Sequence, residues 1–100
     1  VQNLYSHRRV LDTAGFEKAR YAACGYALGC TFKPTWMDVP PMIYSGNPLI
    51  LEPGMVFFVH IMIPDTTTGV VAGVGQTFAI GNEGEAVETF SDLPLKLWQL

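Results

Sequence analysis

Two side chains of this sequence can move protons or stabilise negative charge from within predicted strands. His60 lies in an apolar run, and its imidazole, which titrates near neutrality, can act as a general base or proton relay. Tyr26 follows a glycine, and its phenol can donate a hydrogen bond to a substrate carbonyl or a developing oxyanion. Both also have structural interpretations, as a buried histidine held by one hydrogen bond and as a phenol packed in a strand. The residue types alone leave both interpretations open.

A second group of reactive side chains lies a few residues further along. Trp36 can stack on a planar or cationic ligand, and Lys33 and Asp38 flank it with opposite charges. We therefore predict that Trp36, Lys33 and Asp38 bind substrate. The alternatives are a tryptophan that seals a core or interface and a lysine that is only solvated.

The cysteines do not form a recognisable site. Cys24 and Cys30 are separated by five residues, which is not the C-x-x-C spacing of zinc and redox sites. Neither has a visible neighbour that would activate a thiol, so we expect reduced, small apolar residues. The N-terminal residues are polar and do not form a secretory signal, so a cytoplasmic location is expected.

Composition limits the partners. The 100 residues are 49% hydrophobic and only 15% charged, so we expect apolar faces that meet the remainder of a domain or a partner chain. The net charge of −3 argues against nucleic acid, which requires a basic face. No apolar run is long enough to span a bilayer, so no membrane partner is expected.

The elements expected to position these side chains follow from periodicity and breakers. Residues 4–14 fit a helix that ends at Gly15, and residues 23–28 fit a strand. Most of the prolines lie in 32–53, which predicts an ordered loop there and not a central strand.

The second half of the chain predicts a β-hairpin followed by a short strand. The hairpin comprises strands 55–63 and 70–80 around a turn at 65–69, and the last strand is 86–90. Alternation places Phe58, His60 and Met62 on one face of the first strand. The facing side of the second strand is small, with Gly73, Gly75, Thr77 and Ala79. Either the opposite side chains fill this space, or it leaves room for a ligand.

Three segments occur in an order typical of one family: Gly25–Gly29, Leu51–His60 and Val74–Gly84. They resemble the last three motifs of the pita-bread hydrolases (peptidase M24), which include methionine aminopeptidase, proline-specific aminopeptidases (aminopeptidase P) and creatinase. Tyr26, His60 and Gly75 stand where the metal-using members have one histidine and two glutamate ligands. The resemblance implies that residues 1–100 are the C-terminal part of an α/β (α+β) domain with a curved antiparallel sheet backed by helices.

Within that superfamily the chain is most similar to the branch without metal ligands, that of creatinase and the ectoine hydrolases. The similarity rests on Gly25-Tyr26-Ala27-Leu28-Gly29 followed by Phe32-Lys33-Pro34-Thr35-Trp36. It implies a hydrolase without metal or other cofactor that cleaves a C–N bond, amide or amidine, in a small polar metabolite. His60 and Tyr26 would be catalytic, and the principal base or nucleophile would lie upstream.

Two other functions are compatible with the same motifs. One is a catalytically inactive pita-bread domain used for binding or assembly, and the other is a divergent Xaa-Pro peptidase. Homodimers are common in this fold, so we expect a homodimer, with the apolar segment 40–44 as a contact.

Overall fold

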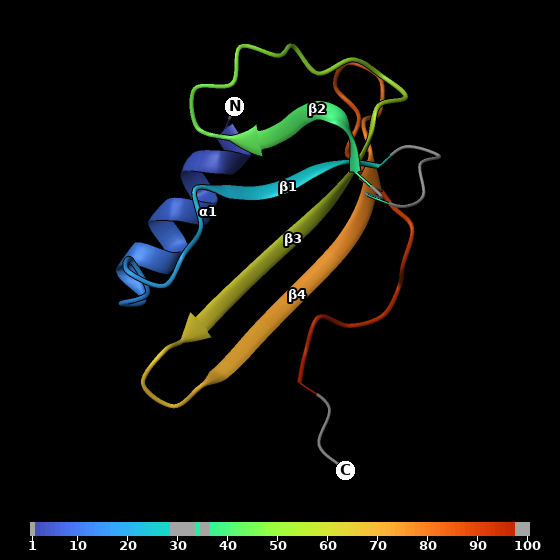
Figure 1. The fold of residues 1–100 in the computed structure, drawn as a ribbon. Coiled ribbons are helices and arrows are strands. Elements are labelled where there is room, and N and C mark those ends of the chain that lie inside the picture. Colours follow the sequence, from blue (N-terminus) through green and yellow to red (C-terminus); the bar gives the residue numbers. More distant parts are fainter. Residues whose placement is uncertain (1, 29–33, 35–36, 98–100) are drawn as a thin grey trace.

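The computed structural model describes residues 2–28, 34 and 37–97. In these residues one helix, α1 (Gln2–Thr13), precedes the strands β1 (Ala23–Leu28), β2 (Met37–Tyr44), β3 (Val56–Asp65), β4 (Val70–Ala79) and β5 (Glu88–Thr89). The strands form one antiparallel sheet in the order β2-β1-β3-β4-β5 (Figure 1). This architecture confirms the predicted fold class and is compatible with part of a pita-bread domain.

Helix α1 ends where the sequence predicted. Gly15 has a positive φ of 87°, a conformation that glycine adopts without a Cβ clash. The Gly15 N–H donates to the Asp12 carbonyl at 3.1 Å, and the Phe16 N–H donates to the Leu11 carbonyl at 2.8 Å. These two bonds form a Schellman cap. Arg20 then pairs with the Asp12 carboxylate, which ties the segment after the helix back to α1.

The prediction of a loop throughout 32–53 was wrong for residues 37–44, which form β2. This strand lies at the edge of the sheet and pairs with β1, with Tyr26 opposite Met42 and Leu28 opposite Met37. The register is irregular between these pairs, where β2 has the additional residues, including Pro40 and Pro41. Prolines are tolerated there because an edge strand needs hydrogen bonds on one side only, and an irregularity leaves residues unpaired.

The long hairpin of β3 and β4 confirms the predicted strands and turn. Their register is continuous from Val56 opposite Ala79 to Asp65 opposite Val70. At the turn, Gly69 has a φ of 74° and its N–H donates to the Asp65 carbonyl at 2.8 Å. The predicted last strand, 86–90, is shorter than expected and comprises only Glu88–Thr89.

The two faces of β3 are also as alternation predicted. Phe57 is 2% exposed and stacks on Phe78 of β4, with ring centroids 5.9 Å apart. A cavity of about 620 Å³ opens on this face; its lining includes Val59 and Ile61 but not Tyr26, Phe58 or His60. Most side chains of β3 and β4 are half-buried or exposed, so much of the sheet's apolar surface is uncovered in the described residues.

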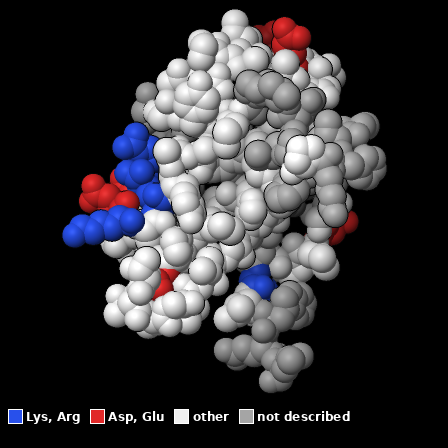
Figure 2. Space-filling view, in the orientation of Figure 1, with Lys and Arg blue, Asp and Glu red and all other residues white. Residues whose placement is uncertain are grey.

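The basic side chains are concentrated on one side of the fold, whereas the acidic ones are scattered (Figure 2). In Figure 2 the Lys and Arg side chains gather mainly over α1, whereas most of the remaining surface in this view is uncharged. In the part of the chain that the structure describes, no helix is long and apolar enough to cross a membrane.

Candidate active site

The structure brings together the two residues that the sequence predicted to be catalytic. Tyr26 of β1 pairs with Phe58 of β3, so His60, two residues further along β3, lies on the same face. The Tyr26 Oη atom is 3.4 Å from His60 Nδ1, and the two rings meet edge to face, with centroids 6.0 Å apart. Either atom can donate, depending on the tautomer of the imidazole.

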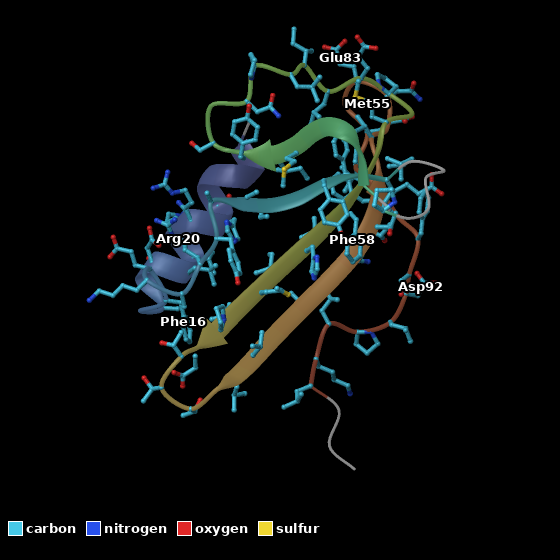
Figure 3. The ribbon with its side chains drawn as sticks, viewed as in Figure 1. Phe16, Arg20, Met55, Phe58, Glu83 and Asp92 are labelled. Carbon is cyan, nitrogen blue, oxygen red and sulfur yellow. The ribbon has the colours of Figure 1, made fainter. Side chains whose placement is uncertain are left out.

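Phe58 completes a cluster of three rings with this pair. Its ring centroid lies 5.7 Å from that of Tyr26 and 5.4 Å from that of His60, with tilted planes in both cases. Figure 3 labels Phe58 where β1 passes beside the β3–β4 hairpin. Strand alternation predicts Phe58 on the His60 face, but its contact with Tyr26 is not predictable from local sequence, because it depends on the long-range register of β1 with β3.

Strand β4 forms the other side of the cluster. Gly75 lies opposite His60, and Thr77 lies opposite Phe58. A Cβ atom on Gly75 would lie 2.9 and 3.2 Å from the two Cε atoms of Phe58 and closer still to Cζ. The Phe58 ring therefore fills the space left by the missing side chain. At this position the opposite side chain fills the small face of β4, and no room is left for a ligand.

Burial differs between the two members of the pair. Tyr26 is 8% exposed, whereas His60 is half-buried, so solvent or a small molecule reaches the imidazole more readily than the phenol. Among the described residues, no group of three or more His, Cys, Asp or Glu side chains is arranged to hold a metal ion.

The predicted substrate-binding residues are only partly placed. Lys33 and Trp36 lie outside the described residues, and so does Cys30. Asp38 is the second residue of β2, and the structure describes its backbone but not its side chain. Cys24 is a free, buried thiol in β1, and burial raises its pKa, which disfavours the nucleophilic thiolate at neutral pH.

A comparison with curated proteins finds a similar sequence in a hydrolase. The chain is 30% identical over 88 residues to ectoine hydrolase of Halomonas elongata. The alignment includes 88% of this chain but 21% of that protein, so the chain spans about a fifth of the length of this relative. No family model matches the chain, and no solved structure matches it. The similarity suggests a relationship to creatinase-like hydrolases, the same group that the motifs resemble.

Proposed function

We propose that this chain is part of a metal-independent hydrolase that cleaves a C–N bond in a small polar metabolite, such as a cyclic amidine of the ectoine type. The observation that carries the proposal is the contact between Tyr26 Oη and His60 Nδ1 at 3.4 Å. The sequence similarity to ectoine hydrolase supports it. Trp36, Lys33 and Asp38 remain the proposed substrate-binding residues, and the principal base or nucleophile is proposed to lie outside these 100 residues.

One tautomer of His60 gives both residues a role. If Nδ1–H donates to the Tyr26 oxygen, the Nε2 atom can accept the proton that the principal base removes from the attacking water. The phenol O–H can donate to the atom on which negative charge develops, the oxygen of an amide or the nitrogen of an amidine. A new C–O bond then forms, the imidazolium returns the proton to the leaving nitrogen, and the C–N bond breaks. The water is consumed, and the enzyme regains its starting protonation state.

The test is a substrate screen of the intact protein, with ectoine as the first probe and with other small cyclic amides and amidines. Hydrolysis is expected to persist in the presence of a chelator. We expect His60→Gln to lower kcat by about 10²-fold or more, since proton transfer to the leaving nitrogen is lost. Tyr26→Phe should lower it by about 10²-fold, since an oxyanion donor is lost. Tyr21→Phe is the matched control, because Tyr21 is exposed and lies before β1.

Full activity in both Tyr26→Phe and His60→Gln would overturn the assignment of this pair as catalytic. Loss of activity with chelator, restored by a divalent ion, would overturn metal independence alone. Equal loss in Tyr21→Phe would show that the effect is not specific to the site.

One observation favours a second candidate function, a catalytically inactive binding or assembly domain. The Phe58 ring fills the space above Gly75, and Tyr26 is nearly inaccessible, so the described part of the site has little room for a substrate beside the phenol. A folded intact protein that hydrolyses none of the probes, and in which Tyr26→Phe and His60→Gln leave partner binding unchanged, would favour this candidate.

A further inference from the structure

The outer edge of β4 is unpaired along most of its length in the described residues. On one side β4 pairs with β3 over its whole length, but on the other side β5 pairs only with Phe78 and Ala79. The chain after β5 adds two contacts nearby, from the Phe90 N–H to the Thr77 carbonyl at 3.2 Å and from Gln76 Nε2 to the Ser91 carbonyl at 3.1 Å. No described strand pairs with this edge from Val70 to Gly75.

The alternation of a β-strand identifies the backbone groups that this edge presents. The N–H and C=O of one residue point to the same side, and those of the next residue point to the other. Ile80 bonds toward β3, since its N–H donates to the Met55 carbonyl at 2.9 Å, whereas the Thr77 carbonyl accepts from Phe90 on the outer side. By this parity, Val71, Gly73 and Gly75 direct their N–H and C=O groups outward, and Ala72 and Val74 bond to β3.

The side chains along this edge do not protect it. Every residue from 70 to 75 is exposed, and the exposed fractions of Val70, Val71 and Val74 are 62%, 57% and 40%. The segment has no charged residue and no proline, and its pairing with β3 is free of bulges. Charged residues, prolines and bulges are the features with which proteins protect a free edge strand from unwanted pairing. Their absence is typical of an edge that is covered in the native protein.

We propose that the edge of β4 from Val71 to Gly75 pairs with a β-strand of the same polypeptide that lies outside these 100 residues. Two observations support this occupant. The chain spans only about a fifth of the length of the Halomonas elongata relative, so a protein of similar size has ample additional sequence to supply a strand. The uncharged, apolar edge also suits a permanent partner within one fold, because obligate contacts are more apolar than transient ones.

The added strand would lie beside the face that carries the site. Cβ atoms on Gly73 and Gly75 would contact Met62 and Phe58, so the outward-pointing residues of β4 share the face of His60. A strand paired with them places its own side chains on that face at alternate positions. The pairing itself is independent of the proposed hydrolase activity, and the experiment below does not measure activity.

The test is amide hydrogen exchange in the intact protein, resolved to single residues by NMR, together with its mass in solution by sedimentation. Ala72 and Val74 serve as internal controls because their N–H groups bond to β3. We expect the amides of Val71, Gly73 and Gly75 to be protected at least about 100-fold relative to an unstructured peptide, similarly to Ala72 and Val74, at every protein concentration tested.

Three results would overturn the proposal. The first is protection at Ala72 and Val74 with fast exchange at Val71, Gly73 and Gly75, which would show an open edge. The second is fast exchange at all five positions, which no paired strand allows. The third is protection of the outward amides only at concentrations at which the protein is a dimer, which would show that a second copy covers the edge.

Discussion

The ring of Phe58 occupies the position where a side chain of Gly75 would begin, across the β3–β4 pair. This relationship connects two separate features of the sequence, a large aromatic residue and a glycine in the middle of a strand. The glycine is needed here for space and not for backbone conformation, since its φ is not positive. Because Phe58 also contacts Tyr26 and His60, the geometry of the proposed catalytic pair depends on the absence of a side chain at position 75.

The first prediction concerns Gly75→Ala. The added methyl group would overlap the Phe58 ring, and we expect the free energy of unfolding of the intact protein to fall by about 1–3 kcal/mol, as for other overpacked sites. Gly73→Ala is the matched control: its Cβ would lie 3.7 Å from the nearest atoms, an ordinary contact, so the change should be within about 0.5 kcal/mol. Urea denaturation measures both, and equal effects would contradict the prediction.

A double-mutant cycle tests whether Phe58 is the cause. In a Phe58→Leu background the clash is relieved, so Gly75→Ala should cost less than it does with the phenylalanine present. A coupling free energy of at least about 0.5 kcal/mol is expected for residues in direct contact. Additive effects of the two substitutions would show that another neighbour opposes the methyl group.

The second prediction concerns Gly25, where β1 approaches β3 closely. A Cβ atom there would lie 2.5 Å from the Phe58 carbonyl oxygen and 2.9 Å from Cδ1 of Ile43. A backbone atom cannot move aside as a side chain does, so Gly25→Ala should cost more than Gly75→Ala, about 3 kcal/mol or more. Thermal unfolding of the intact protein measures the difference, and a smaller cost than that of Gly75→Ala would contradict it.

Local signals made much of the fold predictable from the sequence. Alternation in 55–63 gave the two faces of β3, and the polar turn residues with Gly69 gave the hairpin. The helix end at Gly15 followed from glycine's tolerance of positive φ. The prolines misled the prediction for 37–44, because proline excludes a central strand but not an irregular edge strand, and strand order is not visible in local sequence.

The candidate site was predictable in part. Tyr26 and His60 were identified by their chemistry and by the motifs around them, and their contact at 3.4 Å follows from the register of β1 with β3. Phe58 was not recognised as the third ring, because its contact with Tyr26 depends on the long-range register of β1 with β3. The proposed roles of Lys33, Trp36 and Asp38 remain predictions.

The third prediction concerns the reactivity of Cys24. Burial raises the pKa of its thiol, so at neutral pH it should be almost entirely protonated and poorly accessible. The Cys30→Ser substitution in the intact protein leaves Cys24 as the one cysteine of these 100 residues. In this variant we expect iodoacetamide to alkylate Cys24 at least about tenfold more slowly than an exposed thiol. Addition of denaturant is the control and should restore the ordinary rate, whereas fast alkylation of the folded protein would contradict the prediction.

The turn between β3 and β4 supplies a titrating group that stabilises the hairpin. The Thr68 hydroxyl donates to the Asp65 carboxylate at 2.7 Å, and the Thr67 N–H donates to it at 2.9 Å. These two hydrogen bonds favour the charged form and lower the pKa of Asp65, with Thr68 as the largest cause.

The last prediction follows from the sign of this shift. A carboxyl group with a lowered pKa in the folded state stabilises the fold above its unfolded value, about 3.9, and this contribution is lost as the pH falls through the folded value. Thr68→Val should therefore raise the pKa of Asp65 toward its ordinary value, and the fall in stability at acid pH should become shallower. Carbon-detected NMR titration of the intact protein measures the pKa. Thr66→Val, a change in the same turn at a residue that is not among the causes of the shift, should leave it unchanged. An unaltered Asp65 titration in Thr68→Val would show that the backbone N–H groups of the turn suffice to hold the carboxylate.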